Sequence, residues 1–292
     1  MLIFDNLNPV TIAVYYLAVV TVSMFTMNPV LHVIAFTGGI LQFGFIKTGD
    51  KARTHVFYWL IGLILALIRP IFSHNGATVL FVVNDNPITK ESFIYGANAA
   101  VMVVGVLYLF RVFSDTMTSD KLLYLFGRFS PKTALVMSMG LRFIPLLRRQ
   151  KRMIGQAQTA IGINKDDNAI DRIKAGLNEF WATVGWGLEN GIITADSMAA
   201  RGYGQGRRSR FSLFRFKTGD AVMLITLAVL LTPVIAALAT GRYDTSFYPR
   251  YTAAETGMSG IVGYICYGML LAIPVLIIIS ENIRWKYLMS KI

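Results

Sequence analysis

The sequence contains little of the chemistry on which secreted, redox-active or metal-binding proteins depend. Its 292 residues include one cysteine, Cys266, in an apolar run without a second thiol for a disulfide or a metal site, so we interpret it as a packing residue. Only 15% of the residues are charged, whereas 54% are hydrophobic. This balance excludes an ordinary soluble domain and is typical of an integral membrane protein.

Catalytic and nucleotide-binding patterns are also missing. The three histidines, His32, His55 and His74, are scattered, and none has a histidine or carboxylate three or four residues further on. Residues 202–209 contain three glycines but lack the Gly-Lys-Ser/Thr of a phosphate-binding loop. We therefore expect no catalytic residue, no metal site and no cofactor bound by this chain, and we interpret the histidines as polar packing or interfacial residues.

Long uncharged runs predict about six membrane-spanning helices. Residues 10–46 contain no Asp, Glu, Lys or Arg, which suits two helices of about 18 residues separated by a turn at Asn28-Pro29. The residues before this run carry Asp5 and no basic cluster, so we expect the run to be retained and not cleaved as a signal peptide. Four further spans are expected at residues 55–73, 92–110, 221–240 and 257–280.

The distribution of charge predicts the orientation of the chain. The formal net charge is +12, and residues 114–218 hold 17 Lys and Arg against 8 Asp and Glu. Because basic loops stay in the cytoplasm, we expect this segment and both termini to be cytoplasmic. Arg69, near the outer end of a span, is either a snorkelling anchor or a contact for a membrane partner. The expected organisation is membrane helices at residues 1–113, a cytoplasmic helical region at 114–218, and membrane helices with a cytoplasmic tail at 219–292.

The basic segment has apolar residues at helical spacing, which predicts amphipathic helices and not a disordered tail. Ser130-Pro131 is expected to cap and begin one helix, Pro145 to bend or end it, and Gly162 to follow the end of the helical stretch beyond. Asp166 or Asp167 can cap the next helix, and a last one is expected from about Leu188 to Arg201. The predicted fold is an all-α integral membrane protein with an inserted layer of amphipathic cytoplasmic helices.

The end of the last of these helices has the features of a docking tip. Ala200 allows a partner's backbone to come close, and Arg201 offers planar hydrogen bonds to a carboxylate or to carbonyl groups. A cation in the last turn also suits the helix dipole, and Gly202 suits a helix end. The alternative is that Arg201 is a solvated cation and Gly202 an ordinary cap.

Several motifs give the sequence a resemblance to a known family, and they cover nearly the whole chain. The motifs are Asn8-Pro9, Asn28-Pro29, Ile88-Thr89-Lys90-Glu91, and the more specific Gly140-Leu141-Arg142-Phe143-Ile144-Pro145 and Ala195-Asp196-Ser197-Met198-Ala199-Ala200-Arg201-Gly202-Tyr203-Gly204. With them the sequence resembles the T component of energy-coupling factor transporters, the membrane subunit that couples cytoplasmic ATPases to a vitamin- or metal-binding membrane partner.

The resemblance implies two docking motifs, each at the end of a coupling helix and each held in a groove of one ATPase subunit. The second motif corresponds to Ala200, Arg201 and Gly202. The first corresponds to Ala160, Ile161 and Gly162, where Ile161 replaces the expected arginine. The implied partners are two cytoplasmic ABC ATPase subunits, a small substrate-binding integral membrane subunit and membrane lipid, but no nucleic acid. The replacement of arginine by Ile161 implies that the two ATPase subunits are different proteins. ATP would be used by the partners.

The residues alone leave two other classes of function open. A polytopic membrane enzyme acting on lipid would need paired carboxylates, a histidine pair or an activated serine near the end of a span. A basic membrane receptor or scaffold would use residues 114–218 to bind phosphates and would show a steep salt dependence. The apolar stripes and the small-residue tip fit a protein socket better, so we expect a non-catalytic coupling subunit for the uptake of a vitamin or metal ion.

Overall fold

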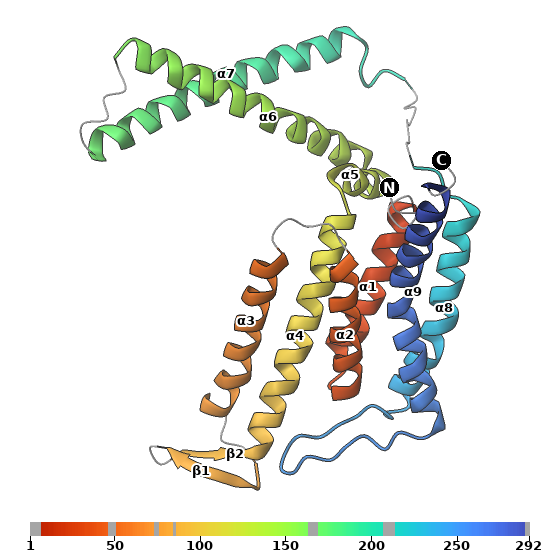
Figure 1. The fold of residues 1–292 in the computed structure, drawn as a ribbon. Coiled ribbons are helices and arrows are strands. Elements are labelled where there is room, and N and C mark those ends of the chain that lie inside the picture. Colours follow the sequence, from red (N-terminus) through yellow and green to blue (C-terminus); the bar gives the residue numbers. More distant parts are fainter. Residues whose placement is uncertain are drawn as a thin grey trace. The chain divides into compact units, whose positions relative to one another are not determined.

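The computed structural model describes residues 7–45, 51–72, 76–83, 86–162, 169–206 and 214–289. The chain divides into two compact units (Figure 1). The membrane unit comprises Met1–Lys121 and Phe214–Ile292, and the inserted unit comprises Leu122–Leu213. The inserted unit lies within the region 114–218 that the sequence assigns to the water side.

The membrane unit contains an apolar helix at each of the six expected spans. α3, α4, α8 and α9 are long and apolar enough to cross a membrane. α1 and α2 have 17 residues each, which corresponds to about 26 Å of helix and the lower limit for crossing. The chain is therefore a multi-pass helical membrane protein. The bounds are α1 (Pro9–Phe25), α2 (Pro29–Phe45), α3 (Lys51–Phe72), α4 (Lys90–Thr116), α8 (Thr218–Ala239) and α9 (Met258–Met289).

The two Asn-Pro pairs begin the first two helices. The Asn8 side chain accepts a hydrogen bond from Val10 N at 3.0 Å, and the Asn28 side chain accepts one from Val30 N at 2.9 Å. Each asparagine thereby satisfies a backbone N–H that has no partner inside its helix. The following proline fits the first helical position because it has no N–H to satisfy.

A buried carboxylate joins the beginnings of α1 and α8, which are more than 200 residues apart in sequence. Asp220 is 1% exposed and accepts hydrogen bonds from the backbone N–H groups of Asn8 at 2.7 Å and Lys217 at 2.8 Å. The Thr11 hydroxyl donates a third bond at 3.3 Å. A carboxylate between two helix N-termini is further stabilised by both helix dipoles.

Histidines take part in packing, as expected from the sequence. His32 is fully buried, with Nδ1 2.8 Å from Asn98 Oδ1 and Nε2 2.9 Å from the Thr26 carbonyl oxygen, so it joins α2 to α4 and to the end of α1. His55 Nδ1 lies 2.7 Å from the Tyr108 hydroxyl and joins α3 to α4. His74 lies outside the described residues.

α3 and α4 approach each other closely where α3 ends and α4 begins. Pro70 lies inside α3 and has no N–H to donate to the Ala66 carbonyl. Gly96 of α4 faces this carbonyl, and a Cβ at Gly96 would lie 2.7 Å from its oxygen. Next to this contact, the Arg69 guanidinium lies 4.5 Å from the centre of the Tyr95 ring and donates to its hydroxyl at 3.1 Å. Arg69 therefore has an intrachain partner on α4.

The connection between α3 and α4 contains a hairpin that the sequence analysis did not anticipate. β1 (Val79–Val83) pairs antiparallel with β2 (Asn86–Thr89). The run Val79-Leu80-Phe81-Val82-Val83 has the β-branched and aromatic residues that favour a strand. Thr89 then caps α4 by accepting a hydrogen bond from Ser92 N.

The inserted unit consists of long helices: α6 (Pro131–Ala160) and α7 (Ala169–Ala200), with α5 (Ser119–Phe129) leading into them. Ser130 caps α6 and Pro131 is its first residue, as predicted. Two expectations need correction. α6 does not end at Pro145 but continues to Ala160, and it contacts α7 on both sides of this proline, through Phe143 and Gly155.

α7 is one helix of 32 residues, and no separate helix begins near Leu188. Its interior contains glycines, which cost about 1 kcal/mol each, but no proline, so nothing forces a break. The proposed caps Asp166 and Asp167 lie outside the described residues.

Candidate functional site

The candidate site consists of the C-terminal ends of α6 and α7. α6 ends in Ala160, followed by Ile161 and Gly162. Ile161 N donates to the Ala157 carbonyl at 3.1 Å, and Gly162 N donates to the Thr159 carbonyl at 3.0 Å. Gly162 has a φ of +76°, a left-handed conformation that glycine adopts without steric cost. The expectation that Gly162 follows a helix end is confirmed.

α7 ends in the same way. Gly202 N donates to the Ala199 carbonyl at 2.9 Å, and Tyr203 N donates to the Met198 carbonyl at 3.0 Å, which together form a Schellman cap. Gly202 has a φ of +73°. Ala160-Ile161-Gly162 and Ala200-Arg201-Gly202 therefore share two features: a glycine in the left-handed region, and a hydrogen bond from that glycine N–H to the carbonyl three residues earlier. Their roles in binding ATPase subunits stay predictions.

The two ends differ in the side chain that each helix presents just before its glycine. Ile161 is 73% exposed, although it is apolar and β-branched. Arg201 is also exposed. A Cβ at Gly162 would meet no atom within 4 Å, so open space surrounds that end. The structure does not bring the two tripeptides together, since they lie at opposite ends of the crossed helix pair (Figure 1).

α6 and α7 cross at positions where glycine lets them come close (Figure 1). A Cβ at Gly155 of α6 would lie 2.6 Å from a carboxylate oxygen of Glu179 on α7. A Cβ at Gly187 of α7 would lie 3.3 Å from the Leu147 side chain. Phe143 stacks on Trp186 with ring centres 6.3 Å apart. These contacts connect the two candidate ends mechanically.

The inserted unit has exposed apolar faces and little interior. α6 contains no buried residue. The apolar stripe expected on α7 is present, but its large side chains are exposed by half or more: Ile170, Ile173, Leu177, Phe180 and Trp181. Contiguous exposed apolar surface of this kind marks a face for a membrane or a protein partner. The unit therefore has the surface of a docking element.

The described part of the chain holds no cluster of three His, Cys, Asp or Glu residues that could bind a metal ion. Cys266 is a free, half-buried thiol on α9. Sequence reasoning missed the polar contacts of Asp220, because no local pattern connects it to Asn8 across more than 200 residues. The sequence signal that could have identified Asp220 is its place three residues after Lys217, the cap residue of α8, where an acidic side chain can accept from the backbone N–H of the cap.

The multi-pass helical fold with an inserted pair of helices whose apolar faces are exposed is that of a membrane protein with a docking surface. A sequence model of the family described as CbiQ, cobalt transport protein, matches residues 3–213, and the chain belongs to this family. Together with the relatives described next, this membership makes the chain a transmembrane coupling subunit of the energy-coupling factor class of transporters.

Three curated relatives carry the name energy-coupling factor transporter transmembrane protein EcfT. The protein from Listeria innocua serovar 6a is 30% identical over 185 residues, which cover 59% of this chain and 69% of the relative. A protein from Listeria monocytogenes serotype 1/2a is 27% identical over 66% of this chain and 78% of its own length. The Bacillus selenitireducens protein is 25% identical over 72% of this chain and 84% of its own length.

Proposed function

We propose that the chain couples two cytoplasmic ABC ATPase subunits to a small substrate-binding membrane subunit. The ends of α6 and α7 insert into grooves of the two ATPases, and closure of the ATPases on ATP moves the crossed helices. This movement is transmitted to the substrate-binding subunit, whose cargo is a vitamin or a metal ion. The observation that carries the proposal is that α6 and α7 of one unit both end in a left-handed glycine, Gly162 and Gly202, whose N–H donates to the carbonyl three residues earlier.

The proposal includes an orientation and a division of labour. Both termini and the inserted unit face the cytoplasm, because the basic excess of residues 114–218 favours that side. The chain itself is non-catalytic and binds no cofactor, and ATP is bound and hydrolysed by the partners. The exposed apolar face of α7 lies against lipid or against the substrate-binding subunit.

Arg201 is the residue whose removal tests the proposal most directly. A charge-assisted hydrogen bond is worth about 1.5–3 kcal/mol, so Arg201→Ala should weaken ATPase binding by about 10- to 100-fold. The measurement is the affinity of the purified ATPase subunits for the chain in nanodiscs, together with ATP-driven uptake by the complete transporter. Arg149→Ala is the matched control, because Arg149 is an exposed cation of α6 away from both helix ends.

Ile161→Arg tests whether the two docking positions are unlike. If Ile161 binds an apolar wall, burying a new guanidinium there weakens binding of that one ATPase and leaves the other in place. The asymmetric arrangement is contradicted if Arg201→Ala and Ile161→Arg reduce ATPase binding equally and severely in a transporter with two identical ATPase chains. Uptake by the isolated chain, or full ATPase binding by Arg201→Ala, contradicts the function itself.

A further inference from the structure

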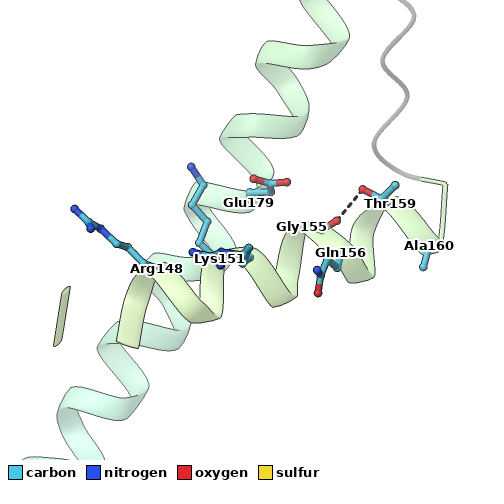
Figure 2. A pocket seen from close by; sticks show the side chains of 8 residues that line it. Arg148, Lys151, Gly155, Gln156, Thr159, Ala160 and Glu179 are labelled. Carbon is cyan, nitrogen blue, oxygen red and sulfur yellow. Dashed lines mark hydrogen bonds between the residues drawn. The ribbon is translucent and has the colours of Figure 1, made fainter. Parts of the chain in front are cut away.

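A basic pocket lies on one face of α6 directly before its exposed end. It has a volume of about 730 Å³, and α6 supplies most of its lining (Figure 2). The residues recur at helical spacing and therefore share one face of the helix. They are Arg148, Lys151, Arg152, Gly155, Gln156, Thr159 and Ala160, with Glu179 reaching in from α7.

Three cations and one carboxylate line this pocket. Arg148, Lys151 and Arg152 are exposed, and within the described residues none of them has an ion-pair partner. Like charges three and four residues apart on a helix repel each other. Figure 2 shows Glu179 extending from α7 toward Gly155, with the Lys151 and Arg148 side chains projecting from α6. The pocket therefore has a positive excess that an anionic occupant would relieve.

The corresponding face of α7 carries no cation at the positions where α6 has three. Counting back from Gly202 as from Gly162, the positions of the three cations are occupied by Leu188, Gly191 and Ile192, and that of Gln156 by Asp196. α7 thus carries its cation at the tip, as Arg201, and none at these face positions. α6 carries an apolar residue at the tip and its cations along the face.

We propose that the α6 pocket binds an acidic segment of one of the two ATPase subunits, and that this contact decides which subunit docks on α6. The inference rests on the proposed function. In this arrangement Ile161 contacts an apolar wall while the three cations hold carboxylates of the same subunit. The charge missing at the tip is supplied about two and a half to three and a half turns earlier on the same helix. An ATPase without the acidic segment would bind only at Arg201.

The composition of the pocket favours a protein segment over a lipid headgroup. Glu179 repels a carboxylate and a phosphate alike, so the preference comes from the spread of the three cations along α6: a peptide can place carboxylates beside them and uncharged groups beside Glu179, whereas a lipid headgroup carries its phosphate at one point. The pocket wall also continues through Ala160 to the exposed Ile161, which needs an apolar partner. A segment with acidic, hydrogen-bonding and apolar side chains matches all of these features.

The test uses the complete transporter in nanodiscs, with its own two ATPase subunits. Arg148→Glu combined with Arg152→Glu reverses two pocket charges, and Lys132→Glu combined with Arg149→Glu makes the same change at exposed α6 cations outside the pocket. We expect the pocket variant to lose about tenfold or more in affinity for one ATPase, with little change for the other. The control should keep both.

A photo-reactive side chain in place of Gln156 identifies the occupant. The expected cross-link joins α6 to an acidic stretch of one ATPase, and replacing an acid there by arginine should restore binding to the pocket variant. The proposal is overturned if the pocket variant and the control variant bind the ATPase subunits equally well. It is also overturned if the pocket variant keeps its ATPase binding but no longer binds phosphatidylglycerol vesicles. If thermal unfolding shows that the glutamate variant does not fold, Arg148→Gln with Arg152→Gln replaces it. Failure of the unaltered chain to bind any ATPase contradicts the proposed function instead.

Discussion

Replacing Gly96 by alanine should destabilise the membrane unit, although alanine is the better helix former. The added Cβ would lie 2.7 Å from the Ala66 carbonyl oxygen and 3.1 Å from the Arg69 Cβ. Neither atom can move alone, since one is backbone and the other is attached to it. α3 and α4 must therefore separate at the place where Pro70 leaves the Ala66 carbonyl without its helical donor.

The expected magnitude follows from two opposing effects. Overpacking at a rigid contact costs about 1–3 kcal/mol. Exchanging glycine for alanine inside a helix gains about 0.5–1 kcal/mol. The net loss should be about 1–2 kcal/mol, and it should be larger for Gly96→Val. The separation should also weaken the contact of Arg69 with Tyr95, because these residues are next to the clash.

The assay is thermal unfolding of the purified chain in nanodiscs, followed by tryptophan fluorescence. Gly140→Ala is the matched control, because a Cβ at Gly140 in α6 would meet no atom within 4 Å. The midpoint should fall by several degrees for Gly96→Ala and stay level or rise for Gly140→Ala. A rise for Gly96→Ala equal to that of the control would refute the reasoning.

Two further predictions concern the polar tie of the membrane unit and the missing core of the inserted unit. Asp220→Asn should destabilise the chain by about 1.5–3 kcal/mol. The two carboxylate oxygens of Asp220 accept from Asn8 N and Lys217 N, whereas an amide has only one oxygen to accept with. Thr226→Val, on the exposed side of α8, is the control in the same unfolding assay. A fragment of residues 122–213 should unfold without a cooperative transition in water and gain helix in detergent, measured by circular dichroism, since α6 contains no buried residue. A sharp thermal transition of the fragment in water would contradict this.

The sequence predicted the membrane helices well because their signals are local. A run without charges has to form its own backbone hydrogen bonds in lipid, and a helix does so within one segment. The Asn-Pro and Ser-Pro pairs likewise act within four residues of a helix start, as Ser130 does for α6. Gly162 was identified at a helix end by the same kind of local rule.

Features that depend on distant contacts were not predictable in this way. α6 passes through Pro145 and contacts α7 before and after it, and no residue near Pro145 carries information about these contacts. The pocket cations were visible as a basic run, but the sequence did not show that Gly155 opens space for Glu179 among them. The 79–83 strand was overlooked because five apolar residues are too few to tell a strand from the end of a membrane helix.

The positions of the crossing contacts make the two candidate ends mechanically unequal. Gly155, where α6 meets Glu179, comes six residues before Ile161, or about 9 Å along a helix. Gly187, where α7 meets Leu147, comes fourteen residues before Arg201, or about 21 Å. From the Gly155–Glu179 contact the two arms are six and twenty-two residues long, and from the Leu147–Gly187 contact both are fourteen. Rotation about the middle of the crossing, with arms of ten and eighteen residues, therefore moves the α7 end roughly twice as far as the α6 end. A short arm suits a broad grip by several charges along its face, whereas a long arm suits a single contact at its tip that can pivot with the ATPase. The distribution of charge on the two helices follows this division.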